Sequence, residues 1–388
     1  MAVKTVNESS LTQVAEAIRG KTNTSGPILF PDGFVQKINE IQTAGGTNIW
    51  EERYAAFCTG AGDIVLPKME HAMLWQDMTN ATSFDCSNVK IVEFKDDIFK
   101  NATLPEVNFG GNQEVIYTRT NTYGVFGTIG KINYDLPSVT QRLFDSAIVT
   151  EEINMTSRVK TYNTYCFYRN KPAVWNIDWP NGDLTFGSYC FRDTNIKVLD
   201  FVGPSSITFN PGSFHDTEID TLKFYKNQTV KVPATGTGNF ATINNLIFNN
   251  SDMPVNLFRS ATINNLTGIQ DCPTIGGSAF RAATLPAGPL ELNAKIFDAD
   301  AFNGATGPTV LTLNNAEKIG LSAFANISSL TEVHLNNIPA SLPSSSYAVF
   351  AKCPNLTDVY CNFPSGSIVE NKLVTSGQNV TFHYTDSK

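Results

Sequence analysis

Charged residues are scarce in this sequence. Asp, Glu, Lys and Arg make up 16% of its 388 residues, whereas about 25% is usual for a soluble protein. Lys and Arg nowhere form a run, and the formal net charge is −8. A basic stripe is what displaces counterions from nucleic acid and attracts a protein to an anionic membrane. We therefore expect no nucleic-acid partner and no binding to a membrane surface.

Long apolar segments are also missing. The sequence contains no window of about 18 uncharged apolar residues, so we expect no membrane insertion. The first residues, MAVKTVNESS, lack the apolar core of a secretory signal peptide. We expect the protein to be made in the host cytoplasm and, if it reaches the outside, to be released by another route.

Candidate catalytic and metal-binding residues are few and scattered along the sequence. The seven cysteines form no C-x-x-C pair, and the four histidines lie in no metal or triad motif. No nucleotide-binding loop, nucleophile elbow or zinc-protease motif occurs. Adjacent acidic residues such as Glu151 and Glu152 would point to opposite faces of a strand, which makes them poor catalytic pairs. We predict reduced, buried cysteines, no metal, no cofactor and no enzymatic activity.

A repeated phrase dominates what is present. IGLSAFANISSLTEVHL (319–335) and YAVFAKCPNLTDVYC (347–361) each contain a Phe, a Leu six residues later, a Val at nine and an apolar residue at eleven. The last two would alternate along a strand and face inward. We expect the anchor rings to fill a continuous core. The anchors are Phe99, Phe126, Phe144, Phe167, Phe191, Phe214, Phe240, Phe258, Phe280, Phe302, Phe324 and Phe350.

The spacing of the anchors and the residues around them indicate the type of repeat. Anchors separated by 18–27 residues, with a strand in each copy, are typical of leucine-rich repeats. TIGGSAF (274–280) and KIGLSAF (318–324) resemble the IGxxAFxxCxxLxxIxIP phrase of BspA-like leucine-rich repeats, and Cys353 stands at its cysteine position. This resemblance covers residues 75–361. It implies a mainly β repeat solenoid of about 12 irregular copies.

The first 43 residues are of a different kind. Their caps and apolar stripes predict two short helices, which together form a helical hairpin. Residues 10–41 resemble the SLxxIADAIRxKTGxxxxxxFPxGFVxxI segment that begins many tail-associated and other structural proteins of phages and prophages of Gram-positive bacteria. In that setting the hairpin would dock to the particle; alternatively, it caps the repeat array. The candidate docking residues are Leu11, Val14, Ile18, Phe30, Phe34 and Ile38.

One stretch of the repeat array, residues 161–179, is unusually aromatic. Amphipathic aromatic residues beside polar groups suit sugar faces and protein hot spots. One interpretation is therefore a contact with a glycan or a surface protein; the other is a repeat with bulkier core residues. The candidate ligand-binding residues are Tyr162, Tyr165, Tyr168, Arg169, Trp175 and Trp179.

These observations divide the chain into four segments. Residues 1–43 are the hairpin, 44–74 a linker with a degenerate first repeat, 75–361 the solenoid and 362–388 a C-terminal cap. Within them, Val89, Val92 and Phe94 predict an extra strand, and the alternating VTFHY (380–384) predicts a closing strand. Asn-Asn pairs such as Asn314-Asn315 follow several strands, where we expect them to satisfy backbone groups of the turns.

The combination suggests a non-enzymatic virion protein of a phage or phage-tail-like particle. It would be a tail-fibre or receptor-binding component at the particle surface, bound through its N-terminus to other virion proteins and through the solenoid to a host polysaccharide or surface protein. Such a fibre could be a homotrimer. Two alternatives stay open: a decoration or head-fibre protein whose solenoid is structural, and a BspA-like bacterial surface adhesin.

Overall fold

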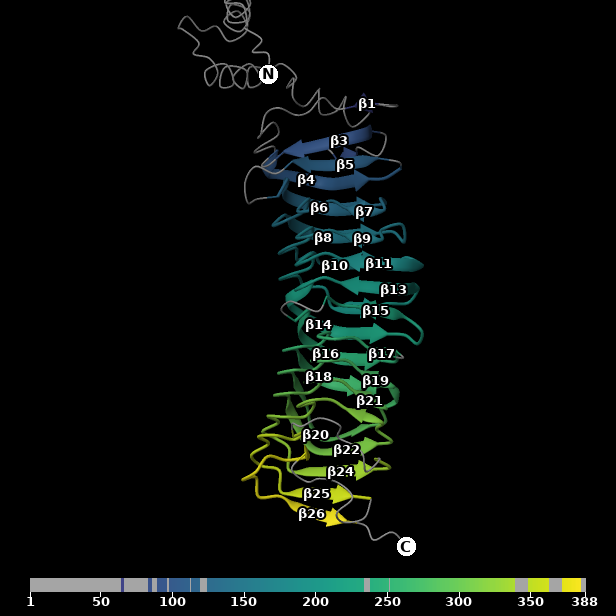
Figure 1. Cartoon of the computed structure of the whole chain (residues 1–388). Helices are drawn as coiled ribbons and strands as arrows, with labels where there is room; N and C mark the ends of the chain where they lie inside the picture. The colour runs from purple at the N-terminus through teal and green to yellow at the C-terminus, as the bar shows by residue number, and fades with distance from the viewer. Residues whose placement is uncertain are drawn as a thin grey trace, which may run out of the picture.

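The computed structural model describes residues 64–65, 83–85, 89–95, 98–111, 113–118, 124–233, 238–250, 252–338, 348–362 and 372–384. Over these ranges the chain winds into successive coils stacked along one axis (Figure 1). Every pairing between strands is parallel, because each coil returns the chain to its starting direction. The predicted repeat solenoid is therefore confirmed, whereas the expected N-terminal hairpin lies outside the described residues.

The longer strands form one side of the solenoid, which we call the broad wall. It consists of a five-stranded and a nine-stranded sheet. The five-stranded sheet contains β2 (Phe84–Asp85), β4 (Phe99–Phe109), β6 (Phe126–Tyr134), β8 (Ile148–Met155) and β10 (Val174–Ile177). The nine-stranded sheet contains β12 (Val198–Asp200), β14 (Phe214–Phe224), β16 (Phe240–Phe248), β18 (Thr262–Thr267), β20 (Thr284–Leu292), β22 (Thr306–Asn314), β24 (Glu332–Asn336), β25 (Asp358–Cys361) and β26 (Thr381–Tyr384).

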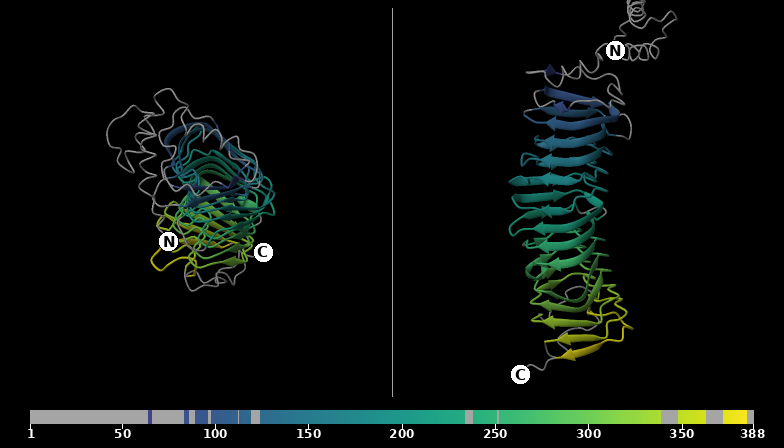
Figure 2. Two further views of the ribbon diagram at one scale, coloured as in Figure 1. Left: turned by 90° about the horizontal axis from the view of Figure 1, so that it is seen from above. Right: turned by 180° about the vertical axis from the view of Figure 1, so that it is seen from behind.

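Mostly shorter strands form the narrow wall, which runs beside the broad wall in both side views (Figure 1 and Figure 2). Its first sheet contains β1 (Ile64–Val65), β3 (Val89–Lys95) and β5 (Glu114–Thr118). Its second contains β7 (Ser138–Val139), β9 (Thr161–Tyr162), β11 (Gly182–Phe186), β13 (Pro204–Phe209) and β15 (Thr229–Lys231). Its third contains β17 (Asp252–Met253), β19 (Thr274–Ile275), β21 (Ile296–Phe297) and β23 (Lys318–Ile319).

Alternation of side chains explains the broad-wall strands. In β24, Val333 and Leu335 are buried and His334 between them faces outward, as the offsets of nine and eleven residues from the anchor predict. The predicted extra strand and closing strand are also present, as β3 and β26. A short 3-10 turn, η1 (Ile269–Asp271), follows β18, and no helix in the described ranges is long and apolar enough to cross a membrane.

The anchor phenylalanines form one continuous column through the core. All twelve are at most 5% exposed, and the ring centroids of every successive pair lie 4.9–5.7 Å apart. Most pairs are nearly parallel; the rings of Phe191 and Phe214, for example, differ by 1°. This column buries the largest apolar side chains of the chain and joins the coils into one core.

Most anchor phenylalanines lie at the centre of a tight turn, whereas Phe99, Phe126, Phe214 and Phe240 are the first residues of β4, β6, β14 and β16. The side of the solenoid that these anchor positions form is a third side, which we call the turn edge. The amide of Phe167 donates to the carbonyl of Cys190 in the next coil at 2.9 Å, and that of Phe302 to Ala323 at 2.7 Å. In six coils, the residues two before and two after the anchor donate in the same direction and have positive φ; these are the coils anchored by Phe144, Phe167, Phe191, Phe258, Phe280 and Phe302. These coils therefore use the same left-handed positions to hydrogen-bond to the next.

Asparagine side chains join the coils on the outer surface. On the five-stranded sheet, Asn133 donates to Asn108 and Asn154 donates to Asn133, both at 2.7 Å. On the nine-stranded sheet, Asn336 donates to Asn314 at 2.9 Å. The Asn-Asn pairs thus form ladders between coils more than they satisfy turns within one coil, because parallel in-register strands bring identical side chains together.

The sequence phrase predicted one strand per repeat, but most coils have two. The second strand is the narrow-wall strand just before the anchor turn, such as β23, in which Ile319 is buried. A two-residue strand is too short to produce a detectable alternation. The structure also corrects the expected orientation of Glu151 and Glu152: a register shift in β8 turns both outward, and Lys131 Nζ lies 3.8 and 2.9 Å from their carboxylates.

Candidate binding surfaces on the solenoid

The six candidate ligand-binding residues do not form one site. Tyr162 is completely buried, its ring stacks on Phe186 at 5.5 Å, and its hydroxyl has no hydrogen-bond partner. Burial raises the pKa of this phenol well above its usual value. Tyr162 is therefore a core residue, out of reach of an external ligand. The other five candidates divide between the turn edge and the broad wall.

The first surface is a row of tyrosine and arginine side chains along the turn edge, which we call the Tyr–Arg ridge. The rings of Tyr165 and Tyr189, on successive coils, stack at 5.2 Å, and Tyr168 meets Tyr165 edge-on at 5.5 Å. Large aromatic side chains of this kind dominate protein interfaces. The residues of the ridge are Arg142, Tyr165, Tyr168, Arg169, Tyr189 and Arg192.

Cation–π contacts and ion pairs hold the ridge in place. The guanidinium of Arg142 lies 4.1 Å from the ring centre of Tyr165, and that of Arg169 lies 4.6 Å from Tyr168. Arg192 Nε donates to the carboxylate of Asp216 at 2.9 Å. Arg169 and Arg192 pair with carboxylates of the next coil, and Arg142 pairs with Asp145 of its own coil. The ridge is therefore rigid and almost neutral rather than a strongly cationic patch.

The backbone of the ridge is strained. Arg142, Tyr165, Arg169 and Tyr189 have φ between 56° and 66°, a region that bulky side chains rarely adopt and that costs about 1–3 kcal/mol per residue. The same positions hold small residues elsewhere, for example Ser322. Strain that a Gly or Asn would relieve is commonly retained at functional sites. The sequence indicated this stretch as a candidate binding site because of its aromatic residues, but only the structure reveals the backbone strain.

The second surface is a groove on the broad wall, which we call the tryptophan groove. It has a volume of about 430 Å³ and is lined by Trp175, Ile177, Trp179, Val198 and Val202, among others. Val198 and Val202 are 57% and 63% exposed, unusually open for valine. Composition suggested the tryptophans as ligand contacts but did not reveal the valines, because these come from the following coil.

Comparison with known proteins identifies the repeats. Residues 128–253 and 251–373 match the family described as BspA type leucine rich repeat region, in six copies. Together these matches cover well over half of the chain. The chain belongs to the BspA-type leucine-rich repeat family. No curated protein and no solved structure matches it.

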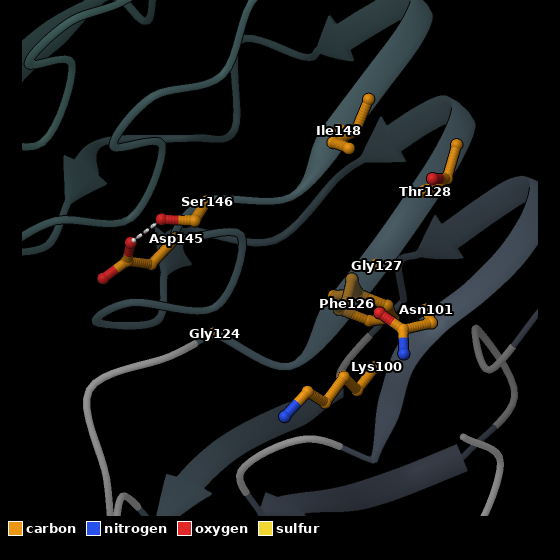
Figure 3. Close-up of a pocket in the computed structure, with 9 residues that line it drawn as sticks. All are labelled: Lys100, Asn101, Gly124, Phe126, Gly127, Thr128, Asp145, Ser146 and Ile148. Atoms are coloured by element: carbon orange, nitrogen blue, oxygen red, sulfur yellow. Dashed lines mark hydrogen bonds between the residues drawn. The ribbon is translucent and has the colours of Figure 1, made fainter. Parts of the chain in front are cut away.

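Another hollow of this BspA-type solenoid lies on the turn edge near its N-terminal end (Figure 3). It has a volume of about 240 Å³ and is lined by Lys100, Phe126 and Asp145, among others. The hydroxyl of Ser146 donates to the Asp145 carboxylate at 2.8 Å, the dashed line in Figure 3. Gly124 is required there, because a Cβ would lie 2.2 Å from the carbonyl oxygen of Asp145. The lining contains a single carboxylate, so it offers no paired acid and base.

The BspA-type repeats bury their cysteines. All five cysteines in the described ranges are buried, and burial raises the pKa of the Cys353 thiol to about 11 and that of Cys272 to about 12. A thiol is nucleophilic only as the thiolate, so these side chains act as small core residues. Within the same ranges, no group of three or more His, Cys, Asp and Glu residues is arranged to hold a metal ion.

Proposed function

We propose that this chain is a non-enzymatic receptor-binding component of a phage or phage-tail-like particle. Its N-terminal segment docks to the particle, and its BspA-type solenoid contacts the surface of the host cell. The two halves of this proposal have different support. The resemblance of residues 10–41 to structural proteins of phages and prophages supports the docking role, and the surface of the solenoid supports the binding role.

The observation that carries the binding role is the Tyr–Arg ridge. It spans successive coils, presents Tyr165, Tyr168 and Tyr189 together and holds them with paired arginines. Tyrosine and arginine are the residues enriched at binding hot spots. A rigid row loses little conformational entropy on binding, and the strained backbone beneath it shows that the row is maintained at a cost to stability.

The chemistry of the solenoid favours recognition over catalysis. The raised pKa values of Cys353 and Cys272 keep these thiols protonated. Glu151 and Glu152 share the ammonium of Lys131, whose hydrogen bond lowers the pKa of Glu152. A carboxylate held ionised in this way is a poor general acid. These features support a binding protein that works through an extended surface.

The test separates docking from recognition with the full chain. We would label the purified protein and measure its adsorption to a panel of Gram-positive cells and its incorporation into particles assembled without it. We expect Phe34→Asp, in the candidate docking segment, to abolish incorporation and leave adsorption unchanged. We expect the double change Tyr165→Ser with Arg169→Ser to reduce adsorption at least ten-fold and leave incorporation unchanged.

A matched control is Ser278→Ala with Ala282→Ser, at the same two turn positions of a regular coil. It should change neither readout. If the ridge variant adsorbs like the wild type, or if the wild type binds only particles and no cell, the receptor-binding role is wrong. In the second case the solenoid would be a structural decoration of the particle.

A further inference from the structure

The broad wall is interrupted once in the described coils. The five-stranded sheet ends at β10 and the nine-stranded sheet begins at β12, the next broad-wall strand along the chain. All other successive strands of this wall, from β2 to β26, are hydrogen-bonded neighbours. The tryptophan groove lies at this interruption, because Trp175 and Ile177 come from β10 and Val198 from β12.

We attribute the interruption to the bulk of the Trp175 side chain. It occupies an inward column that holds Ile132 and Ile153 in the preceding coils and Leu199 and Leu222 in the following ones. Strands in a sheet lie about 4.8 Å apart, a spacing at which aliphatic side chains pack closely. Because β10 keeps its regular pairing with β8, where Trp175 lies opposite Ile153, the larger indole is accommodated on the side of β12. Overpacking of this kind displaces the backbone. The indole therefore separates two coils and leaves interior side chains accessible from outside.

The groove is rigid. Trp175 Nε1 donates to the side-chain oxygen of Asn195 at 2.8 Å, and Asn195 Nδ2 donates to the carbonyl of Pro172 at 2.7 Å. Trp175 also packs edge-on against Phe167 at 5.6 Å, and Trp179 packs against Phe201 at 5.1 Å. The two indoles are thus fixed before a ligand arrives, which reduces the entropy lost on binding.

Charge and hydrogen-bonding capacity restrict what the groove would hold. Asp178 and Asp200 line it beside the apolar residues. Their carboxylates accept hydrogen bonds and donate none, and they repel anionic ligands. Asp200 already accepts a hydrogen bond from the hydroxyl of Tyr225 at 2.7 Å and lies 3.9 Å from Lys223 Nζ. A purely apolar ligand would therefore mainly penalise Asp178, whose carboxylate it would remove from water without a donor. A peptide backbone brings as many acceptors as donors, so it matches a rim of acceptors less well than a ligand rich in hydroxyl groups.

We propose that the tryptophan groove binds an uncharged oligosaccharide. The apolar face of a sugar ring would pack against the indoles and the valines, while its hydroxyls would donate to Asp178 and Asp200. The volume of about 430 Å³ lies in the usual range for small-ligand sites, about 300–1,000 Å³. This inference deepens the proposed host-binding function by naming the class of ligand, and it assigns that ligand to the broad wall rather than to the Tyr–Arg ridge.

The test uses the full-length protein and a broad array of uncharged glycans, with a polyglycerol-phosphate polymer and extended neutral peptides as competing ligands. Hits would be quantified by calorimetric titration and by tryptophan fluorescence. Trp175→Leu restores the aliphatic column, so we expect it to fold and to weaken glycan binding at least ten-fold. Val202→Lys should have a similar effect by obstructing the groove. Ile148→Lys is the control, because Ile148 is 62% exposed but lies outside the groove.

The inference is supported if uncharged glycans bind and only the two groove variants lose affinity. It is overturned if no uncharged glycan binds, if the phosphate polymer or a peptide binds in preference, or if Trp175→Leu binds like the wild type with an unchanged circular dichroism spectrum. Adsorption to cells distinguishes failure of this inference from failure of the proposed function. If the wild type binds no uncharged glycan but still adsorbs to cells, the groove inference alone is refuted, whereas glycan binding without any adsorption refutes the host-binding role.

Discussion

Two regions of one solenoid use the same scaffold in different ways. In the regular coils, the anchors Phe258, Phe280, Phe302 and Phe324 follow each other every 22 residues, and small residues such as Ser322 occupy the left-handed turn positions. In the middle coils, anchored by Phe144, Phe167, Phe191 and Phe214, tyrosine and arginine occupy several of these positions. The broad wall is continuous in the regular coils and interrupted in the middle coils.

The comparison separates what the fold needs from what it tolerates. Both regions have the phenylalanine column, the turn hydrogen bonds and the asparagine ladders. Of these two regions, only the middle coils place strained tyrosine and arginine residues on the turn edge and an indole in an aliphatic column. Features shared by all coils therefore stabilise the solenoid, and the departures in the middle coils mark the surfaces that we propose to bind.

The largest effect should come from removing a ring of the shared column. Phe302 is 1% exposed and stacks between Phe280 and Phe324 at 4.9 and 5.1 Å. Phe302→Ala should lower the free energy of unfolding by about 3–5 kcal/mol, because the cavity cannot close in a stack held on both sides. Urea unfolding followed by circular dichroism measures it. A loss as small as that of a surface mutation would show that the column does not stabilise the fold.

The second-largest effect on stability should come from removing the indole at position 175 or introducing one at position 222. Leu222 is completely buried in the same inward column as Trp175, but in the continuous part of the wall. Leu222→Trp should cost about 1–3 kcal/mol by overpacking. Trp175→Leu should leave stability unchanged or increase it, because the indole no longer separates β10 from β12. Urea unfolding of both variants, with hydrogen exchange of the β10 amides, measures the pair.

The opposite ranking of these two variants would contradict the explanation that the indole of Trp175 separates β10 from β12. If Trp175→Leu is the more destabilising, the indole fits its site. The interruption of the wall would then have another cause.

A smaller and equal effect is expected from the ladders in both regions. Asn154 takes part in two amide–amide hydrogen bonds of 2.7 Å in the middle coils, and Asn314 in two of 2.9 Å in the regular coils. Replacing either with Ala should cost about 0.5–1.5 kcal/mol for each hydrogen bond. Unfolding midpoints measured in parallel would show whether the ladder is a common device; a cost confined to one region would contradict this.

The smallest effect should be a loss of stability at acidic pH. The hydrogen bond from His383 lowers the pKa of Asp358 below its ordinary value of 3.8. A carboxyl with a lowered pKa in the folded state stabilises the fold above the ordinary pKa, and this contribution disappears as the pH falls through the lowered value. Stability should therefore decrease slightly below about pH 4, and Asp358→Asn should reduce that decrease. Unfolding midpoints between pH 6 and pH 2 measure it; an identical pH slope in the variant would contradict it.

The parts of the fold that repeat at fixed offsets were predictable from the sequence. The anchors and the inward Val333 and Leu335 follow from the phrase itself, and the closing strand β26 follows from the alternating VTFHY after it. The narrow wall was not predictable, because strands such as β23 are only two residues long. The register shift that turns Glu151 and Glu152 outward also left no signal, since it depends on pairing with β6.

The candidate surfaces were predictable only in part. The aromatic stretch indicated the right coils but mixed Tyr162, a core residue, with Tyr165 on the turn edge and Trp175 on the broad wall. Arg142 and Arg192 were missed because they belong to neighbouring coils and reach the tyrosines only after stacking. A search for bulky residues two positions before or after each anchor would have found much of the ridge.

The most direct test of the account compares adsorption of three full-length proteins to the same cells. One is the wild type, one carries Tyr165→Ser, Arg169→Ser and Trp175→Leu in the middle coils, and one carries Lys295→Ser, Glu317→Ser and Lys318→Ser on the exposed surface of the regular coils. We predict that the middle-coil variant loses at least ten-fold in adsorption while the regular-coil variant matches the wild type. Equal adsorption by all three, or a loss in the regular-coil variant alone, would contradict it.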